Sequence, residues 1–324
     1  MLTVVLPNFN HARFLPHALR ALLAQTRPAD ELIVIDDAST DNSVEIIETF
    51  LPKLNLKLIR NSENLGVVRN MNIGLHMARG SLLVFSAADD VIYPAFFERM
   101  LALLRAHPQA AFASARTAII DEKGNRTGVL NHPVPLDQPG YIDAKAAARH
   151  LMRDDAWFTG NATIFRRAPL KEIGGFPEDL SALTDGYVSR LLVVKHGACF
   201  TPEILVAWRR MEGGVAWSCV DDIASTRELA ERAEKRMRSS GFPFIPGYPK
   251  RWKRRCLFGV QRFALVNARR EAKLHGTWQF AFALAREIIV TGWLLLTLRP
   301  QDTFVVLRRR LKDDRVGLEY PWRS

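Results

Sequence analysis

The sequence predicts an α/β fold in which a doubly wound, mostly parallel sheet carries helices on both faces, with a basic helical appendage at the C-terminus. Two observations lead to this prediction. In the first third of the chain, short runs rich in β-branched residues alternate with segments of helical apolar spacing, which is typical of βαβ units. The positive charge is concentrated at the other end, where 21 of the 45 Lys and Arg but only 8 of the 34 Asp and Glu lie at or after Glu231.

The first four predicted strands cover Leu2 to Leu6, Glu31 to Ile35, Leu56 to Ile59 and Ser81 to Phe85. Helical spacing between them extends over Phe14 to Gln25, Ser43 to Leu51 and Val67 to Arg79. Right-handed crossovers in such a chain bring the C-terminal ends of the strands to one edge of the sheet. Open α/β sheets bind their ligands at this edge.

The second half of the predicted domain is less regular. Residues Asp121 to Tyr141 are rich in Gly, Pro and Asn, which predicts a turn followed by a loop over the ligand-binding edge. After this loop we expect a strand at Ala162 to Phe165, a helix from Thr184 to His196 and a strand from Ile204 to Trp208. A change in composition near Ser218 to Asp222 predicts two parts, residues 1–220 and the helical, basic residues 221–324.

The basic region contains a largely apolar run from Trp278 to Leu298 that Arg286 and Glu287 interrupt. It falls short of the about 20 apolar residues that a transmembrane helix needs. We expect an interfacial helix bound to an anionic membrane surface. A helix buried against the first domain, with a solvated basic face, is the alternative. Nucleic acid is not an expected partner, because zinc-finger spacing, a basic zipper and an aromatic RNA-binding signature are missing from the sequence.

The overall composition, 48% hydrophobic and 24% charged residues, is that of a folded protein rather than a disordered one. Cys199, Cys219 and Cys256 are odd in number and far apart, so neither a disulfide framework nor a zinc site is expected. The N-terminus lacks the basic and apolar segments of a secretory signal. We therefore expect a cytoplasmic protein that lies peripherally on the inner face of the cell membrane.

A polar cluster follows each of the first four strands. The clusters are Pro7 to Asn10, Asp36 to Asp41, Asn61 to Asn64 with Gly66 and Arg69-Asn70, and Asp89-Asp90. Helix capping is the alternative for residues such as Ser39 to Ser43, but four clusters at successive strand ends favour a binding site. The Gly-rich fingerprints of dinucleotide and P-loop sites are missing, which argues against hydride and phosphoryl transfer.

The side chains in these clusters suit a nucleotide and a hard cation. Asp37 can accept hydrogen bonds from a base N–H or from ribose hydroxyls. Arg69 can counter the charge of a diphosphate. Asp89 and Asp90 offer carboxylate oxygens that can share Mg²⁺ or Mn²⁺ with nucleotide phosphates.

The motifs resemble those of family 2 glycosyltransferases in order and spacing, over about residues 2 to 215. The resemblance rests on Val4 to His11, Leu19 to Gln25, Glu31 to Ser43, Asn61, Asn64-Leu65-Gly66, Arg69-Asn70, Asn72-Ile73-Gly74, Asp89-Asp90, Gly160-Asn161-Ala162, Phe165-Arg166-Arg167 and Ile173 to Phe176. It implies the GT-A fold, in which a nucleotide diphosphate sugar is the donor. The implied enzyme is an inverting, metal-dependent glycosyltransferase of the hexosyltransferase type.

The resemblance also assigns roles by position. The nucleotide site would comprise Pro7, Asn8, Asn10, Asp37, Asn64, Arg69 and Asp89. The metal, Mg²⁺ or Mn²⁺, would be held by Asp89 and Asp90. Asp185 matches the catalytic base, and its alternative role is a helix N-terminal carboxylate favoured by the helix dipole. The implied partners are a nucleotide-sugar donor, with UDP as a candidate nucleotide, and a glycan or lipid-linked acceptor in cell-envelope polysaccharide or glycolipid synthesis.

Two positions depart from the family pattern. Ala87 stands where the metal motif commonly has an earlier carboxylate, and Arg209-Arg210-Met211 stands where a basic pair is often followed by His. The alternative function is therefore that of a non-catalytic protein that binds nucleotide sugars or serves in assembly. The retention of Asp89, Asp90 and Asp185 favours catalysis. Trp157 and Phe158 are either a platform for the acceptor sugar or core residues.

Overall fold

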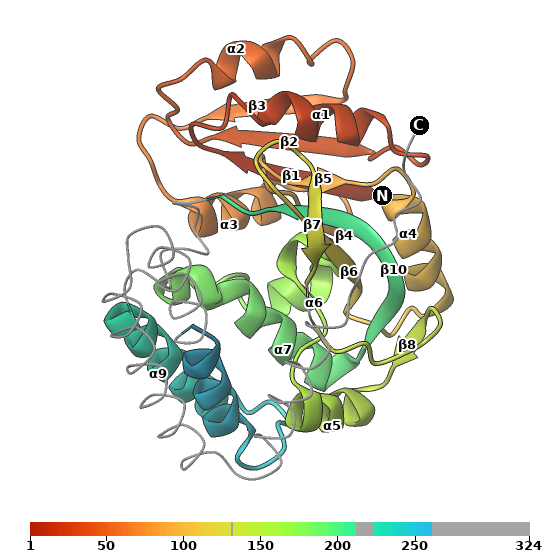
Figure 1. Ribbon diagram of the computed structural model, residues 1–324, viewed down its shortest axis with the longest axis vertical. Coiled ribbons are helices and arrows are strands. Elements are labelled where there is room, and N and C mark those ends of the chain that lie inside the picture. The colour runs from red at the N-terminus through yellow and green to blue at the C-terminus, as the bar shows by residue number, and fades with distance from the viewer. Residues whose placement is uncertain (131, 212–222, 261–324) are drawn as a thin grey trace, which may run out of the picture.

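The computed structural model describes residues 1–130, 132–211 and 223–260. Within these residues, ten strands form one sheet (Figure 1). They are β1 (Leu2–Asn8), β2 (Glu31–Asp36), β3 (Leu56–Arg60), β4 (Leu82–Phe85), β5 (Val91–Ile92), β6 (Phe112–Ile120), β7 (Arg126–Val129), β8 (Gly140–Ile142), β9 (Thr163–Arg166) and β10 (Ala198–Arg209). The α/β class predicted from the alternating pattern is thereby confirmed.

The helices cover both faces of this sheet. They are α1 (Leu15–Leu23), α2 (Ser43–Glu48), α3 (Val67–Met77), α4 (Phe96–Ala106), α5 (Ala144–Asp154), α6 (Arg167–Glu172), α7 (Thr184–His196), α9 (Ile223–Ser239) and a helix over residues 248–260. Short 3-10 helices, η1 (Gly160–Ala162) and η2 (Glu178–Leu183), precede β9 and α7.

The strand order is β3-β2-β1-β4-β9-β6-β10-β5, with β7 added to β6 and β8 to β10. The first four strands are parallel, with Val4 of β1 opposite Leu32 of β2 and Val84 of β4. The next strand, β9, is antiparallel to both β4 and β6. Because β1, β2 and β4 run in the same direction, their C-terminal ends meet at one edge, as predicted.

Alternation along β1 explains how one strand serves two cores. Val5 packs on the side of α3, α5, α6 and α7, whereas Leu2, Val4 and Leu6 pack on the side of α1, α2 and α4. Side chains on opposite faces of a strand follow from its period of two. A strand covered on both faces is nearly continuous in apolar residues, and the one polar side chain in residues 2–6, Thr3, is buried and donates to Glu31 Oε2 at 2.7 Å.

The segment predicted as a turn and loop, Asp121 to Tyr141, also contains β7 and the start of β8. Asp121 closes the turn before β7 by accepting hydrogen bonds from the backbone N–H groups of Lys123 and Asn125. β7 is only four residues long and is partly buried or exposed, so it lacks the apolar alternation that marks a strand in sequence. Its pairing with β6 defines it instead.

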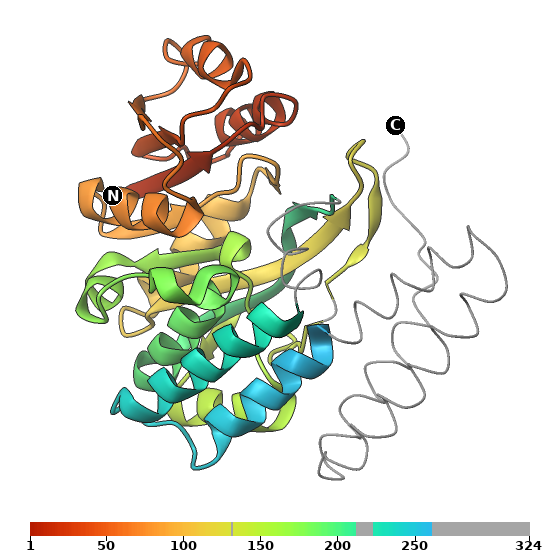
Figure 2. The ribbon, with the colours of Figure 1, turned by 90° about the vertical axis from the view of Figure 1, so that its left-hand side faces the viewer.

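The two C-terminal helices that the structure describes lie side by side in both views of the ribbon (Figures 1 and 2). Ala233 and Met237 of α9 and Tyr248 and Trp252 of the 248–260 helix belong to the same apolar core as α7. Within the described residues, no helix combines the length and apolar character required to cross a membrane. The predicted boundary at Ser218 to Asp222 and the apolar run from Trp278 to Leu298 lie outside the described residues.

Candidate functional site

The ends of β1 and β2 are joined by hydrogen bonds between the first two polar clusters. The Asn8 side chain is 2% exposed and donates to Asp36 Oδ1 at 2.9 Å. Asn10 has a positive φ of 54°, and its Oδ1 accepts from the backbone N–H of Thr40 at 2.8 Å. Ala38 also has a positive φ, 59°. Such conformations are strained for residues other than glycine and concentrate at functional sites.

The Asp37 carboxylate, which follows β2, binds the loop between β3 and α3 by hydrogen bonds. Its Oδ1 accepts from Asn61 Nδ2 at 2.7 Å and from the Leu65 N–H at 2.9 Å, and its Oδ2 accepts from the Gly66 N–H at 2.8 Å. Burial acts to raise the pKa of Asp37, but hydrogen bonds, including one from Asn70, outweigh it and lower the pKa. Asp37 is therefore ionised. Its Oδ1 accepts two hydrogen bonds from the protein and its Oδ2 one, so Oδ2 retains the larger capacity to accept a bond from a ligand.

The other predicted nucleotide-site residues are distributed around this edge. Pro7 is partly buried in β1, and Asn64 is exposed with its Oδ1 accepting from the Gly66 N–H at 3.0 Å. Arg69 is exposed in the first turn of α3 and has no ion pair or hydrogen bond among the described residues. Asn8 Oδ1 is buried and likewise has no hydrogen-bond partner in the described part of the chain.

Asp89 and Asp90 follow β4, and their side chains have different surroundings. Asp90 is 5% exposed; its Oδ1 accepts from the Arg209 N–H at 2.9 Å and its Oδ2 from Asn161 Nδ2 at 2.8 Å. Burial and the charge of Asp89 raise the pKa of Asp90. The Asp89 carboxylate is partly exposed and has no hydrogen-bond partner among the residues that the structure describes. Asp89 is thus the more available ligand.

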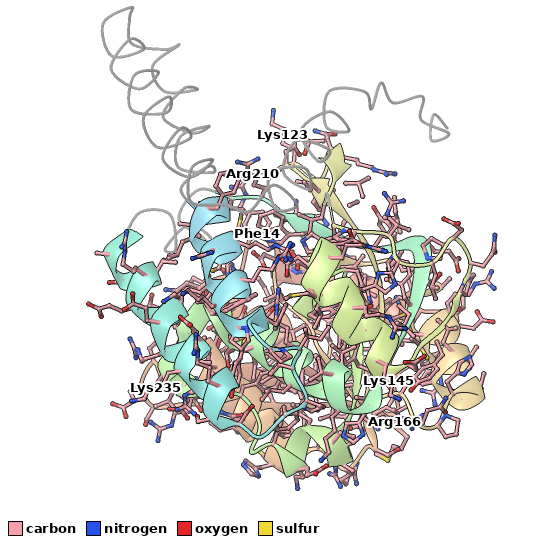
Figure 3. All side chains as sticks on the ribbon, turned by 90° about the horizontal axis from the view of Figure 1, so that it is seen from below. Phe14, Lys123, Lys145, Arg166, Arg210 and Lys235 are labelled. Atoms are coloured by element: carbon pink, nitrogen blue, oxygen red, sulfur yellow. The ribbon has the colours of Figure 1, made fainter. Side chains whose placement is uncertain are left out.

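Arg209 is the first residue of the basic pair before Met211, which stands where the family often has His. The guanidinium of Arg209 is bound by the protein itself. Nε donates to the Asp89 carbonyl at 2.8 Å. Nη1 donates to the carbonyls of Asp121 and Glu122 at 2.9 and 3.0 Å. The guanidinium also lies 4.8 Å from the centre of the Phe14 ring, a residue labelled in Figure 3. Arg209 therefore joins the start of α1, the aspartate pair and the turn before β7.

Asp185 lies in the first turn of α7, beside η1. Its Oδ1 accepts from the Gly186 N–H at 2.6 Å. A Cβ added to Gly160 would lie 2.5 Å from Asp185 Oδ2, so the backbone of η1 approaches the carboxylate directly. Asp185 remains partly accessible to solvent, yet the protein atoms around its carboxylate raise its pKa by burial, against the lowering effects of the Gly186 N–H and the Arg190 charge.

Asn161 is a site residue to which sequence analysis gave no role. It lies in the Gly160-Asn161-Ala162 motif, next to the glycine that touches Asp185, and its own side chain holds Asp90. Two consecutive residues of η1 therefore connect the candidate base with the aspartate pair. The motif was visible in the sequence, but the partners of its side chain were not.

A platform of Trp157 and Phe158 for the acceptor sugar is wrong. These side chains are 1% and 5% exposed and lie in the core, where Phe158 packs edge-on against Phe112. Because both side chains are buried in the core, neither ring offers a face to a ligand. The alternative of core packing holds.

Asp89 and Asp90 fit a divalent cation that is held together with phosphate oxygens, rather than one held by protein side chains alone. Within the described residues, no group of three His, Cys, Asp or Glu side chains comes together. The candidate ligands are the free carboxylate of Asp89 and the remaining lone pairs of Asp90. Mg²⁺ is commonly held by one or two carboxylates together with substrate phosphates, and this arrangement fits the pair at the end of β4.

Among the solved structures that resemble the protein in fold are two complexes with nucleotide sugars. Staphylococcus aureus TarS 1-349 in complex with UDP-GlcNAc aligns with a TM-score of 0.59 and 19% identity, over 89% of this chain and 80% of that one. A mannosyltransferase of Pyrobaculum calidifontis in complex with GDP-Man and Mn²⁺ aligns with a TM-score of 0.58 and 22% identity, over 98% and 88%. The GT-A type predicted from the motifs is thereby confirmed.

Sequence comparison gives the family. The PGL/p-HBAD biosynthesis glycosyltransferase of Mycobacterium bovis is 36% identical over 96 residues, which are 29% of this chain and 38% of that protein. The chain spans 38% to 66% of the length of the first curated relatives that it matches. Residues 3–174, more than half of the chain, match the model of glycosyl transferase family 2. These residues contain the polar clusters at the ends of the first strands as well as the aspartate pair, and the chain belongs to glycosyl transferase family 2.

Proposed function

We propose that this protein is an inverting glycosyltransferase that moves a sugar from a nucleotide diphosphate sugar to an acceptor hydroxyl. The observation that carries the proposal is the connection through η1. Gly160 touches the Asp185 carboxylate, and Asn161 binds Asp90. The candidate base, Asp185, and the candidate metal site at Asp90 are therefore fixed relative to each other. Transfer between a donor and an acceptor requires such fixed positions.

The nucleotide would bind along the ends of β1 and β2, against Pro7, Asn8, Asn10, Asp37 and Asn64. The strained loops there are held by hydrogen bonds before any ligand arrives, which lowers the ordering cost of binding. Arg69 is available to counter the diphosphate charge. The complexes of the two fold neighbours with UDP-GlcNAc and GDP-Man support a nucleotide sugar as donor, with UDP as the candidate nucleotide.

Asp89, with Asp90 beside it, would hold a divalent cation, Mg²⁺ or Mn²⁺. When bound, the cation would stabilise the negative charge of the leaving diphosphate. The Mn²⁺ in the Pyrobaculum structure supports this proposal. Asp90 contributes chiefly by fixing the geometry, because Asn161 and the Arg209 N–H already occupy one site on each of its oxygens.

Asp185 would act as the base in the transfer step. Inversion requires the acceptor oxygen to attack the anomeric carbon from the side opposite the leaving diphosphate, and a carboxylate must accept the hydroxyl proton. Burial raises the pKa of Asp185, which makes its carboxylate a stronger base than a solvated aspartate. Its partial exposure leaves room for the acceptor to reach it.

We place the reaction at the cytoplasmic face of the cell membrane, with a glycan or lipid-linked acceptor of the cell envelope. Four basic side chains of the C-terminal helices, Arg227, Lys235, Lys250 and Arg254, are exposed and have no ion pair within the described residues. An anionic membrane surface attracts such charges. The name of the Mycobacterium bovis relative, a PGL/p-HBAD biosynthesis glycosyltransferase, supports a role in envelope glycolipid synthesis.

A panel of nucleotide sugars would test the proposal. A donor that binds the folded state should raise the melting temperature by mass action, and Mn²⁺ should strengthen the effect. The same donor should then be hydrolysed slowly or transferred to an acceptor by the wild type, and Asp185→Asn should bind it without turnover. Binding with no turnover by the wild type, for any donor and any tested acceptor, would favour the non-catalytic alternative.

A further inference from the structure

Arg190 of α7 carries its charge into the core, a little more than one helical turn after Asp185. It is 8% exposed, and three protein acceptors hold its guanidinium. Nη1 donates to the Gly186 carbonyl at 2.8 Å, Nη2 to Asp155 Oδ1 at 3.1 Å and Nε to the Tyr248 hydroxyl at 2.9 Å. Buried charges are tolerated only when they are paired in this way.

Two aromatic rings enclose the same guanidinium. Its central carbon lies 5.6 Å from the centre of the Phe158 ring and 5.5 Å from that of Trp252, within the range of cation–π attraction. Tyr248 and Trp252 both come from the 248–260 helix. Arg190 is therefore fixed jointly by the catalytic domain and by a helix that follows the family match.

Gly186 connects Arg190 with Asp185. Its carbonyl accepts from Arg190 Nη1, and its N–H donates to Asp185 Oδ1. A Cβ at Gly186 would lie 3.0 Å from Nη1, so a side chain there would crowd the guanidinium. A displacement of the guanidinium would consequently move the peptide group that orients the Asp185 carboxylate.

The C-terminal helices also fix the surroundings of this contact. Arg255 donates to the carbonyls of Leu151, Met152 and Arg153 at 3.0, 3.2 and 2.9 Å, and so caps the end of α5. Cations are favourable at this end of a helix. Asp155 follows the end of α5 and has a positive φ of 73°. Its Oδ1 is the acceptor for Arg190 Nη2.

On the other side, α9 holds the segment that enters α7. Arg236 contacts both carboxylate oxygens of Asp179 in η2, at 3.2 and 2.9 Å. η2 ends where α7 begins. The C-terminal helices thus contact the chain both before and after Asp185.

We propose that Arg190 and Tyr248 are positioning residues for Asp185, and that the helices after residue 223 complete the catalytic unit. The inference rests on the proposed role of Asp185 as the base. Arg190 acts on Asp185 through Gly186 and through its charge, and Tyr248 acts by holding Arg190. Neither side chain needs to touch the donor.

Tyr248→Phe tests the inference because it removes one hydroxyl and keeps the ring. Tyr141→Phe is a matched control: the Tyr141 hydroxyl donates to the His196 carbonyl at 2.8 Å, at the other end of α7. We expect Tyr248→Phe to lower kcat about tenfold or more, since small misplacements of a reacting group are costly. Its donor Kd should be unchanged. Tyr141→Phe should keep kcat within about twofold of wild type, although its melting temperature should fall about as much as that of Tyr248→Phe.

Arg190→Lys supplies a second readout, the pH profile. Lysine keeps the charge but cannot present a guanidinium fork to three acceptors. With the cation farther from Asp185, its charge should lower the pKa of that carboxyl less than Arg190 does. The acid limb of the kcat profile should therefore move to higher pH. An acid limb at the wild-type position would contradict the inference. So would equal kcat values for the two Tyr→Phe variants.

Asp185→Asn separates the inference from the proposed function. If this variant loses turnover while Tyr248→Phe behaves as Tyr141→Phe does, the inference fails and the assignment of the base stands. If Asp185→Asn keeps near-normal turnover, the proposed base is wrong and the inference falls with it. Loss of kcat in Asp185→Asn and in Tyr248→Phe, with donor binding intact in both, supports the two together.

Discussion

Gly160 and Asp185 are in direct contact across the site: a Cβ on Gly160 would lie 2.5 Å from Asp185 Oδ2. Real Cβ atoms do not approach so closely, so any larger residue at position 160 would push the carboxylate away or shift η1. The glycine therefore allows the backbone that carries Asn161 to lie against the candidate base.

The first prediction follows from this contact. Gly160→Ala should lower kcat by about a hundredfold, the cost of an ångström-scale misplacement of a reacting group, with little change in donor Kd. Gly128→Ala is the control, because a Cβ there meets only Ile119 Cδ1, at 3.9 Å. Steady-state kinetics and donor titration of the two variants check the prediction. Normal kcat in Gly160→Ala would mean that the position of Asp185 does not limit turnover.

The second prediction concerns stability and pH. Asp185→Asn should lower kcat by about 10²- to 10⁴-fold, the contribution of a general base, and yet raise the melting temperature at neutral pH. Because burial raises the pKa of Asp185 in the folded protein, the wild type loses stability as pH rises through that folded pKa, and asparagine does not. The stabilisation by Asn should vanish below the unfolded pKa of aspartate. Thermal unfolding across pH measures the difference in melting temperature between the two proteins. A pH-independent difference would mean that folding does not raise the pKa of Asp185.

The third prediction separates the two aspartates after β4. Asp89→Asn should weaken the Mn²⁺-dependent part of donor binding and leave the melting temperature near that of wild type, because the Asp89 carboxylate has no protein partner in the described residues. Asp90→Asn should lower stability, since Asn161 and the Arg209 N–H donate to different oxygens of Asp90, and the substitution replaces one of these oxygens by an NH₂ group. A buried donor left unpaired costs about 1–3 kcal/mol. Full activity of Asp89→Asn in excess EDTA would contradict metal assistance.

The fourth prediction concerns removal of the chain after residue 222. Such a truncation deletes Tyr248 and Trp252, which are 1% and 4% exposed in the core, and leaves Arg190 without two of its contacts. Loss of a single large buried aromatic costs about 3–5 kcal/mol. We expect the truncated protein to unfold at much lower temperature than the full chain, or to fail to fold. A truncated form with wild-type melting temperature would mean that the first part is autonomous.

The fifth prediction concerns the membrane. The full chain should sediment with vesicles that contain phosphatidylglycerol and not with phosphatidylcholine alone, and high salt should release part of it. The double variant Lys250→Gln, Arg254→Gln should bind less than Lys53→Gln, Lys57→Gln, in which two exposed lysines are removed near β3. Equal binding of the two double variants would place the attraction outside the 248–260 helix.

The common edge at which the polar clusters lie was predictable because the geometry of a parallel sheet is regular. Strand ends recur at the same side of each βαβ unit, so Asn8, Asp37 and Asp89 could be assigned to one edge from their spacing alone. Asp185 was placed in another way: the sequence pattern predicted the helix from Thr184 to His196, and the resemblance to family 2 glycosyltransferases gave Asp185 its candidate role. What a spacing pattern does not contain is the list of partners around each side chain. It therefore gave no indication that Asp37 holds the Leu65–Gly66 backbone, or that Arg209 is engaged by carbonyl groups.

The second half of the molecule was less predictable for another reason. β7 is defined by pairing with β6 rather than by its own residues, and β9 is inserted antiparallel between β4 and β6. Neither follows from local periodicity. Trp157 and Phe158 illustrate the same difficulty, since an aromatic pair before a site motif looks alike in sequence whether it binds a sugar or fills a core.

The antiparallel insertion of β9 has a consequence for the order in which the protein folds. β1 to β4 pair only with one another up to residue 85, whereas β6 has no pairing with β4 and is joined to it through β9. The two halves of the sheet therefore join only after synthesis has passed residue 166. Until then β6, long and largely apolar, has an unpaired edge, and such an edge favours aggregation of the nascent chain.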